Sequence, residues 1–457
     1  MPNTTIAAIS ATGAIGIVRI SGPAAIFIAK SLFHPKKRLD WNQLRTHQIA
    51  YGILAEPGQA PDETQIDIID DIICLVFPSP HSYTGEDVVE FQCHGGPAVL
   101  RRVLGAVFAL GAHPAEPGEF TRRAFLNGRI DLTRAEAVMQ LVTAQSEHAA
   151  RAAAAAMGGA LSARIDDIRG QLTALAAHIA AWVDYPEEDI PALAPAALSR
   201  TLESAITALT QLINRALSDQ LMLSGIHTAL VGKPNVGKSS LMNLLLGYSR
   251  SIVTDLPGTT RDTVSESVML GTLPLRLTDT AGLRNTNDTI EAAGVERSRQ
   301  AMDQAQLIFA VVDASAPLTN EDHAILQTCD PARTILIRNK CDACSERPAP
   351  HAEYNFPAVN TSALTGQGLD DLIAAAETLL GTAHISPHEA ILANQRQADC
   401  AAAALSALEE ARAAIPIGLD AISICIDDAI AALFALTGQS ATEAVVNEVF
   451  ARFCVGK

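Results

Sequence analysis

Short motifs in the middle of the chain carry the residue types that bind the phosphates of a nucleotide. The motif GKPNVGKS (residues 232–239) follows the apolar run Ile226–Val231 and precedes an apolar helical pattern. This is the order of strand, phosphate loop and helix that such a motif requires. Backbone N–H groups of the loop surround phosphates, and the helix N-terminus favours their negative charge. We therefore predict that Lys238 contacts the β- and γ-phosphates and that Ser239 binds Mg²⁺.

Two further motifs are predicted to sense the γ-phosphate. The sequence DTAG (residues 279–282) follows a strand pattern at 273–277, which places the Asp279 carboxylate near Mg²⁺ and a glycine at the γ-phosphate. In GTTRD (residues 258–262), Thr260 is predicted to bind Mg²⁺ and the γ-phosphate through its hydroxyl and carbonyl. Together with the phosphate loop, these motifs predict a switch domain.

The motifs leave more than one candidate for the group that assists hydrolysis. Leu283 stands where a Ras-type switch carries a water-positioning glutamine, so another group must orient the water or neutralise charge. Glu291, Arg284 and Arg261 are the candidates, although a surface charge is an equally good interpretation of Arg261. Asn235 offers a neutral oxygen beside the phosphates, where backbone carbonyls of residues 254–259 could complete a cage for a monovalent cation.

The motif NKCD (residues 339–342) selects the base. The Asp342 carboxylate can accept two hydrogen bonds from N1–H and the 2-amino group of guanine, which adenine does not offer, so we predict GTP as the ligand. The predicted nucleotide contacts are Asn235, Val236, Gly237, Lys238, Ser239, Ser240, Thr254, Asp255, Leu256, Pro257, Gly258, Thr259, Thr260, Asp279, Thr280, Ala281, Gly282, Asn339, Lys340, Asp342, Ser362, Ala363 and Leu364.

The bulk composition indicates a folded, multidomain protein. A length of 457 residues suggests about three domains, and 48% hydrophobic with 18% charged residues excludes a disordered chain. The formal net charge of -17 argues against a broad basic surface for nucleic acid. The N-terminus lacks a signal-peptide pattern, no apolar run reaches the length of a membrane span, and the eight cysteines are scattered. We therefore expect a reduced, cytoplasmic compartment and no membrane.

Hydrophobic periodicity predicts the elements that position these motifs. A small α+β domain comes first, and alanine-rich helical stretches flank the switch domain on both sides. The switch domain is thus inserted between two parts of one helical domain. Strands are expected at 15–20, 72–77, 88–93 and 334–337, and helical stretches at 97–110, 135–183, 196–221, 387–414 and 418–436.

Separated blocks, in the order expected for one known family, resemble that family over nearly the whole chain. GKPNVGKSS, TDLPGTTRD, DTAGL and NKCD look like the switch domain of the tRNA modification GTPases called MnmE or TrmE. IGIVRISG (15–22), SYTGEDVVEFQCHGG (82–96) and PGEFTRRAFLNGRIDLTRAEAV (117–138) resemble the N-terminal and first helical segments of that family, and FCVGK (453–457) resembles its C-terminal signature. Arg129 departs from the usual lysine at its position, and the glycine-rich stretch before IGIVRISG is shortened to ATGAIG.

The resemblance implies an architecture and a set of ligands. It implies an N-terminal folate-binding and dimerisation domain (1–127), a discontinuous helical domain (128–224 and 382–457) and an inserted Ras-like, doubly wound GTPase domain (225–381). It implies potassium-stimulated hydrolysis across a homodimer. K⁺ would be held by Asn235, Thr254, Leu256 and Thr259, while Glu291 orients the water. A 5-formyl-tetrahydrofolate or a related one-carbon folate would contact Arg19, Glu90, Arg129 and Lys457.

The resemblance also implies a reaction and a protein partner. The family works with the flavin-dependent protein MnmG (GidA), in a heterotetramer that adds an aminomethyl or carboxymethylaminomethyl group to C5 of the wobble uridine, position 34, of certain tRNAs. Cys454 lies in the terminal motif, where a chemical role and a merely buried cysteine are about equally expected. His94, beside glycines, is more often structural than catalytic.

Two other functions remain open at this point. A ribosome-assembly or RNA-chaperone GTPase would share the switch motifs, but it typically adds a basic RNA-binding module, which the alanine-rich tail and the net charge of -17 do not supply. A purely regulatory switch would leave the N-terminal blocks unexplained.

Overall fold

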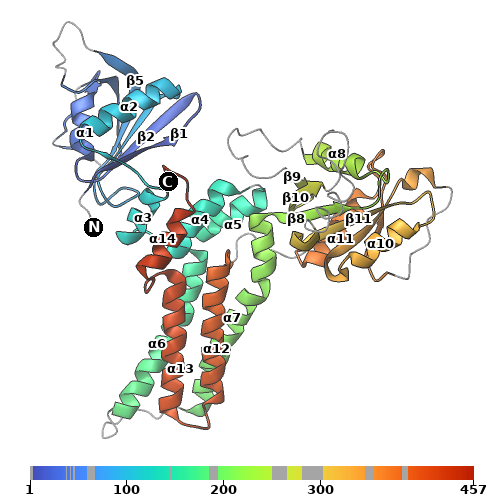
Figure 1. Cartoon of the computed structure of the whole chain (residues 1–457). Coiled ribbons are helices and arrows are strands. Elements are labelled where there is room, and N and C mark those ends of the chain that lie inside the picture. The colour runs from blue at the N-terminus through green and yellow to red at the C-terminus, as the bar shows by residue number, and fades with distance from the viewer. Residues whose placement is uncertain are drawn as a thin grey trace. The chain divides into compact units, whose positions relative to one another are not determined.

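The protein is described from a computed structural model (Figure 1). The structure describes residues 4–37, 39–41, 43–44, 47–58, 67–144, 146–184, 194–249, 265–279, 302–344, 354–382 and 390–456. The chain forms two compact units, of which the first comprises Met1–Met139 and Ala431–Lys457 and the second comprises Gln140–Ile430.

The two units contain the following elements. The strands are β1 (Ile6–Ala11), β2 (Ile15–Ser21), β3 (Phe33–Pro35), β4 (Gln48–Ala55), β5 (Ile68–Phe77), β6 (Val88–His94), β7 (His113–Pro114), β8 (Ile226–Val231), β9 (Ser265–Leu270), β10 (Leu273–Asp279), β11 (Leu307–Asp313), β12 (Thr334–Asn339) and β13 (Ala358–Asn360). The helices are α1 (Ala25–Leu32), α2 (Pro97–Ala109), α3 (Glu119–Leu126), α4 (Leu132–Thr143), α5 (Glu147–Met157), α6 (Ala160–Asp184), α7 (Pro195–Ser224), α8 (Lys238–Ser249), α10 (Asn320–Thr328), α11 (Leu369–Leu380), α12 (Gln395–Ala413), α13 (Leu419–Thr437) and α14 (Glu443–Ala451), with 3-10 helices η1 (Pro331–Arg333) and η2 (Cys341–Ala343).

The first unit is built on a seven-stranded sheet in the order β3-β4-β5-β6-β2-β1-β7. All neighbouring strands are antiparallel except β1 and β7. Helices α1 and α2 cover one face of the sheet (Figure 1), and alternate residues of β2 and β6, such as Val18 and Phe91, are buried against them. The strands and the helix predicted for this part of the chain are confirmed, and the domain is α+β.

The opposite face of this sheet carries exposed apolar side chains. Tyr51 of β4 pairs with Ile73 of β5, and these side chains are 52% and 41% exposed. Ile49, two residues before Tyr51, is 66% exposed. Arg19 and Glu90 are cross-strand partners on β2 and β6, and Glu90 also pairs with Leu75 of β5. A folded domain rarely leaves such a face in water unless another surface covers it.

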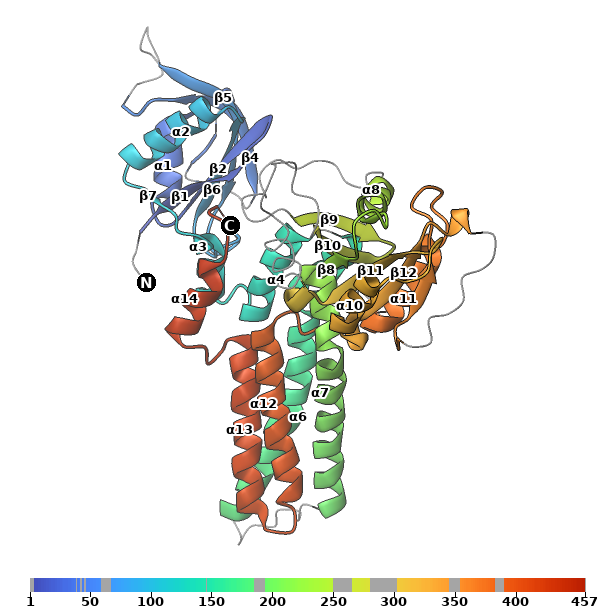
Figure 2. The ribbon, with the colours of Figure 1, turned by 45° about the vertical axis from the view of Figure 1, so that its right-hand side comes forward.

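The second unit contains a six-stranded sheet in the order β13-β12-β11-β8-β10-β9. The first five strands in this order are parallel, and β9 joins the edge as the antiparallel partner of β10. Alternate residues of its strands belong to two separate apolar clusters, one on each face, of which one includes residues of α8 and α11 and the other residues of α10. Figure 2 shows these helices beside the strands of the sheet. Helices on both faces of a parallel sheet define the predicted doubly wound domain.

The same unit contains long alanine-rich helices. Helix α7 packs against α5, α6 and α12, and the small side chains of Ala205, Ala401 and Ala404 are buried. The helical stretch expected at 135–183 is divided into α4, α5 and α6, with Ser146 capping α5. No helix in the described ranges is long and apolar enough to cross a membrane.

One predicted helix start is wrong. The stretch is expected to be helical from residue 387, but the described residues 390–394 are not helical and α12 begins at Gln395. The side chain of Asn394 accepts a hydrogen bond from the backbone N–H of Gln397, which is the geometry of an N-cap and sets the first residue of the helix. The periodicity of apolar residues does not reveal such a cap, so it could not predict the first residue of this helix.

Candidate functional site

The phosphate loop joins the C-terminal end of β8 to the N-terminus of α8. Gly237 has a φ of +96°, and a Cβ at this position would lie 2.2 Å from Nδ2 of Asn339, so only glycine fits. Asn235 also has a positive φ, +67°, and its side chain is exposed. The free N–H groups and the dipole of α8 favour an anion at this end of the helix. The strand–loop–helix order expected from the sequence is therefore present.

The Lys238 ammonium lies within the phosphate loop. This residue is 8% exposed, and its Nζ donates to the carbonyl oxygens of Gly232 (2.6 Å) and Lys233 (2.8 Å). Ser239 and Ser240, which follow it, are exposed. A phosphate on the loop would offer charge-assisted hydrogen bonds to the same ammonium, and these are roughly twice as strong as bonds to neutral carbonyls.

An ion pair fastens the start of the loop to the neighbouring helix α10. Lys233 Nζ donates to Asp322 Oδ2 (2.6 Å) and to Thr319 Oγ1 (3.2 Å). Asp322 is 2% exposed and forms a capping box with Thr319 at the N-terminus of α10. Burial raises the pKa of Asp322, but hydrogen bonds from Lys233 and Thr319 outweigh it, so the pKa lies below its usual value.

The buried amide of Asn339 connects the phosphate loop to the predicted base loop. Asn339 is 1% exposed; its Nδ2 donates to the Val236 carbonyl (2.9 Å), and its Oδ1 accepts from the Ala363 N–H (2.9 Å). Both ends of the side chain are therefore satisfied by backbone groups from two motifs. The NKCD motif and the segment Ser362–Leu364 therefore lie against the phosphate loop. This is the arrangement that binding of one nucleotide by all three segments requires.

Asp342 lies at the surface beside this junction. It is in η2, which is anchored by a hydrogen bond from Cys341 N to Thr361 O (3.1 Å) and follows Lys340 with a φ of +65°. The Asp342 carboxylate has no hydrogen bond or ion pair among the described residues. Ser362 is fully buried, whereas Leu364 is 85% exposed. An exposed, unpaired carboxylate on a fixed turn can accept the hydrogen bonds of an incoming base.

Lys340 makes a second connection between motifs. Its Nζ donates to the Asn235 carbonyl (2.8 Å) and to Asp313 Oδ2 (2.7 Å) at the end of β11. Burial raises the pKa of Asp313, but hydrogen bonds from Lys340 and Ser315 outweigh it and lower the pKa overall. Lys340 thus fixes the backbone of the residue whose side chain is predicted to bind K⁺.

The γ-phosphate side of the site is described only in part. Asp279 is the last residue of β10 and pairs with Leu230, so its backbone lies beside the start of the phosphate loop. Most of the residues predicted for the switch and the cation cage lie outside the described residues; they are Thr254, Asp255, Leu256, Pro257, Gly258, Thr259, Thr260, Arg261, Thr280, Ala281, Gly282, Leu283, Arg284 and Glu291.

In the first unit, two of the four residues predicted to bind folate, Arg19 and Glu90, are in direct contact. Arg19 Nε donates to Glu90 Oε1 (2.7 Å). The Arg19 guanidinium also lies over two rings, 5.7 Å from the centroid of Tyr83 and 5.5 Å from that of Phe120. The Arg129 side chain lies beside Gly85, and Gly85 belongs to the same turn as Tyr83. Lys457 lies outside the described residues.

The C-terminal motif packs against the N-terminal domain. The Cys454 carbonyl accepts a hydrogen bond from Gly118 N (3.2 Å), and the Gly456 carbonyl accepts one from Ser10 Oγ (2.8 Å). Gly118 has a φ of +66°, and a Cβ there would lie 2.8 Å from the Cβ of Phe453. The side chain of Cys454 is exposed, so a buried structural cysteine is not what the structure shows.

Comparisons with known proteins cover the whole chain. The model described as "GTP-binding protein TrmE N-terminus" matches residues 4–129, and the model described as "MnmE helical domain" matches residues 132–454. A protein of Symbiobacterium thermophilum named tRNA modification GTPase MnmE is 42% identical over 100% of both chains. A protein of the same name from Acetivibrio thermocellus is 39% identical over 99% of both chains. The chain belongs to the MnmE family of tRNA modification GTPases.

This membership confirms the family and the fold class expected from the sequence. It favours tRNA modification over the ribosome-assembly alternative, because the match extends through the N-terminal and helical parts and is not confined to the switch motifs. The relatives are matched over their full length, including the segments that carry Arg19, Glu90 and Cys454.

The sequence did not predict the role of Arg123, the residue that holds the elements of the N-terminal site together. Arg123, whose side chain is 6% exposed, donates to Glu86 (3.0 Å), to Glu119 (2.8 Å) and to the Thr4 carbonyl (2.8 Å). Glu86 in turn accepts from Ser21 Oγ (2.8 Å). This network holds the Ser82–Asp87 turn, with Tyr83, against α3. Two adjacent arginines in PGEFTRRAF were the available signal, but their spacing does not tell which one is buried.

Lys233→Met is expected to lower the local free energy of opening of α10 by about 2–3 kcal/mol, because buried Asp322 would keep only its bonds to Thr319. Hydrogen exchange of the α10 amides at pH 7 measures this loss. Since the pKa of Asp322 is depressed, the ion pair contributes above the usual carboxyl pKa of 3.8 and is lost only as the pH falls below it.

A surface lysine supplies the control for this prediction. Lys36 pairs with Asp71 at 3.2 Å, with both side chains about half exposed. Lys36→Met should leave exchange in its neighbourhood unchanged, since solvent screens such pairs. Equal exchange of the α10 amides in the wild type and Lys233→Met would contradict a stabilising role for the Lys233–Asp322 pair.

Proposed function

We propose that this chain hydrolyses GTP to drive modification of the wobble uridine of certain tRNAs. In the full reaction, an aminomethyl or carboxymethylaminomethyl group is added to C5 of uridine 34, with a formyl-tetrahydrofolate as the one-carbon donor and the flavin-dependent MnmG (GidA) as the partner. The observation that carries the GTPase assignment is the buried Asn339 side chain, which ties the phosphate loop to the base loop. Membership of the MnmE family carries the assignment to tRNA.

Mass spectrometry of wobble-uridine nucleosides tests the proposed reaction. Cells that lack this chain should lose the C5 substituent of uridine 34, and re-expression of the wild-type chain should restore it. Unchanged nucleosides would contradict the proposal and would favour the ribosome-assembly alternative.

Potassium is proposed as the cation that neutralises charge on the transferred phosphoryl group. The exposed side chain of Asn235 supports this role, because Lys340 and the left-handed backbone hold it at the edge of the loop. K⁺ would take the place of an arginine finger, and Glu291 would orient the water. The remaining proposed ligands are Thr254, Leu256 and Thr259, and Mg²⁺ would be held by Ser239 and Thr260.

Replacing K⁺ by Na⁺ is expected to slow GTP hydrolysis at least tenfold at saturating GTP, because the smaller ion fits a cage of fixed carbonyls poorly. The rate of phosphate release in matched chloride salts measures this. Asn235→Ala should remove the dependence on K⁺ and leave the slower rate in both salts. Equal wild-type rates in the two salts would rule out the potassium cage.

A folate site is proposed around Arg19, Glu90, Arg129 and Lys457. The Arg19–Glu90 pair offers a guanidinium and a carboxylate side by side, which suits the amide edge of a pterin and a glutamate tail. The uncovered sheet face with Tyr51 and Ile73 supports a homodimer through this domain. The combination of GTP, folate and tRNA also supports the cytoplasm as the compartment.

Arg19→Ala is expected to weaken binding of 5-formyl-tetrahydrofolate ten- to a hundredfold, because it removes a charge-assisted partner and leaves Glu90 unpaired. Isothermal titration calorimetry of the full chain measures the affinity. Arg102→Ala is the control, since Arg102 also pairs with carboxylates in this domain, Glu56 and Asp67, but lies on α2. Undetectable binding to the wild type, or equal losses in the two variants, would contradict the folate site.

A further inference from the structure

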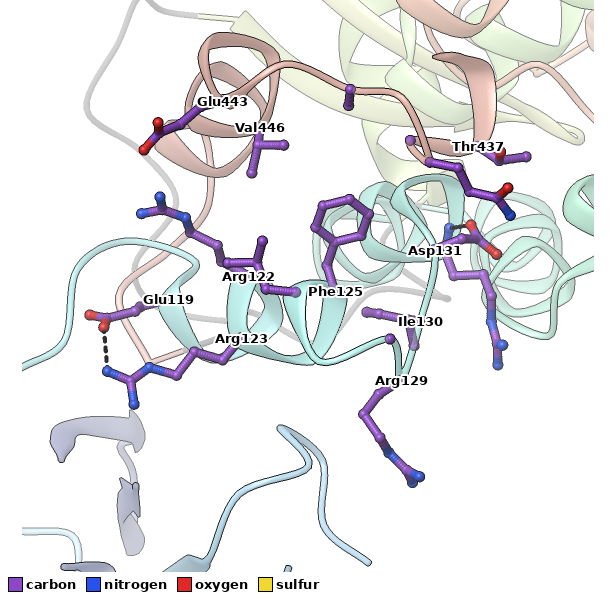
Figure 3. Close-up of a pocket in the computed structure, with 16 residues that line it drawn as sticks. Glu119, Arg122, Arg123, Phe125, Arg129, Ile130, Asp131, Thr437, Glu443 and Val446 are labelled. Atoms are coloured by element: carbon purple, nitrogen blue, oxygen red, sulfur yellow. Dashed lines mark hydrogen bonds and ion pairs between the residues drawn. The ribbon is translucent and has the colours of Figure 1, made fainter. Parts of the chain in front are cut away.

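A large pocket lies in the first unit, and neither Arg19 nor Glu90 lines it. It has a volume of about 980 Å³ and is formed by α3, the turn that leads into α4, and the segment from the end of α13 to α14. The side chains that give it its chemistry are Arg122, Phe125, Arg129, Ile130, Glu443 and Val446 (Figure 3).

Two of the acidic residues in this pocket are already engaged within the protein. Glu119 pairs with Arg123 at 2.8 Å and accepts from Glu116 N at 2.8 Å. Asp131 caps α4 by accepting from Thr133 Oγ1 (2.6 Å) and Arg134 N (3.0 Å). Arg123 therefore balances the charge of Glu119, and the Asp131 carboxylate is held by hydrogen bonds of its own chain; Glu443 is the acidic lining residue with no partner among the described residues.

Two arginines of the pocket have no such engagement. Within the described residues, neither the Arg122 nor the Arg129 guanidinium has a hydrogen bond or an ion pair, and Arg122 Nε is buried without a partner. Arg123, the next residue, makes all its contacts inside the fold. The charge of the partly buried Arg122 guanidinium is therefore not balanced within the described residues, and its remaining N–H groups can donate to an acceptor from outside the chain.

The arrangement of these groups favours a polymer over a small anion. Figure 3 shows Arg122 and Arg129 on different sides of the pocket, with the Phe125 ring and Ile130 in the region between them. Two separated guanidiniums suit successive phosphates of one strand, and an aromatic ring between them suits a stacked base. The four arginines within residues 122–134 also stand out in a chain of net charge -17.

We propose that this pocket binds a single-stranded segment of tRNA, with phosphates at Arg122 and Arg129 and a base against Phe125. The inference rests on the proposed function, which supplies tRNA as the substrate. It assigns to the α3–α14 pocket a role that is separate from GTP binding. Because Arg129 is also proposed for folate, Arg122 is the residue that decides between the two ligands.

The test uses the full chain, unmodified tRNA transcript and its isolated anticodon stem-loop, with affinities measured by fluorescence anisotropy over a series of KCl concentrations. Arg122→Gln is expected to weaken binding of both RNAs about tenfold and to reduce the slope of log affinity against log salt by about one. Arg122→Lys should recover part of the loss, because it restores the charge without the planar fork. Glu443→Gln should tighten binding, a result that misfolding cannot produce.

Arg452→Gln is the matched control. Arg452 follows α14 directly but does not line the pocket, and its pair with Glu448 is exposed at the surface. An equal loss in Arg452→Gln and Arg122→Gln, or no loss in Arg122→Gln, would overturn the proposal. It would also be overturned if Arg122→Gln lost affinity for 5-formyl-tetrahydrofolate and kept its affinity for tRNA, because the pocket would then belong to the folate site.

The cellular assay separates this inference from the proposed function. If cells lacking the chain keep the C5 substituent, the proposed function fails and the inference fails with it. If the substituent depends on the chain but Arg122→Gln restores it as fully as the wild type at limiting expression, only the inference fails. Partial restoration by Arg122→Gln and full restoration by Arg452→Gln would support both.

Discussion

Asp342→Asn is expected to weaken GTP binding about 10³-fold and to allow binding of xanthosine triphosphate. The wild-type carboxylate is exposed and unpaired among the described residues, and it is held on a turn by the Cys341–Thr361 backbone bond. It can therefore accept hydrogen bonds from both N1–H and the 2-amino group of guanine. Two charge-assisted bonds of about 1.5–3 kcal/mol each account for the loss.

The gain of xanthosine triphosphate has a simple geometric reason. Xanthine keeps N1–H but has a carbonyl in place of the 2-amino group. The amide of asparagine can accept from N1–H with its oxygen and donate to that carbonyl with its nitrogen. Swapped specificity would show that the carboxylate faces this edge of the base, which loss of GTP binding alone would not.

Equilibrium titration with fluorescent analogues of the two nucleotides measures this change. Asp370→Asn is the control, since Asp370 is an exposed aspartate in the first turn of α11 in the same unit. It should leave both affinities within twofold of the wild type. GTP affinity unchanged in Asp342→Asn would refute the guanine contact and, with it, the assignment of the NKCD motif.

The nucleotide motifs could be predicted because each depends on residues close together in sequence. A strand, a glycine-bearing loop and a helix within residues 226–249 specify a local geometry, and Gly237 meets the steric demand that the motif implies. Each strand expected around the site is present at its place. Local geometry of this kind follows from residue type and spacing alone.

Contacts between distant segments could not be predicted in this way. Lys233 and Asp322 are 89 residues apart, and Ser10 and Gly456 are 446 apart, so no periodic pattern links either pair. Each depends on how the elements pack. The Lys233 side chain can pair with Asp322 because β8 and β11 are adjacent strands and α10 follows β11.

The two adjacent arginines of α3 also have roles that could not be predicted from the sequence. Arg122 and Arg123 have the same side chain and lie on the same helix, yet Arg122 has no hydrogen bond or ion pair among the described residues, whereas Arg123 is buried against Glu86 and Glu119. Consecutive helical positions point about 100° apart, so one faces the core and its neighbour does not. Only the position of the β-sheet relative to α3 decides which arginine does which.

Lys238→Met is expected to reduce the turnover number for GTP about 10³-fold, which corresponds to about 4 kcal/mol of transition-state stabilisation. The ammonium lies inside the phosphate loop, with its donors directed at the Gly232 and Lys233 carbonyls. A bound triphosphate would present its β- and γ-oxygens to the same donors as negative charge develops on the leaving group. Methionine keeps an unbranched side chain of similar length and removes the ammonium, with both its charge and its N–H donors.

Lys233→Met provides the matched comparison, because it removes a lysine charge from the same loop. Its ammonium is directed to Asp322 and not to the carbonyls of the loop. It should therefore destabilise α10 while changing turnover less than tenfold, whereas Lys238→Met should lose turnover with α10 intact. Single-turnover hydrolysis and hydrogen exchange on the two variants separate these effects. If both variants lost turnover equally, the charge of the loop as a whole, and not the position of Lys238, would account for catalysis.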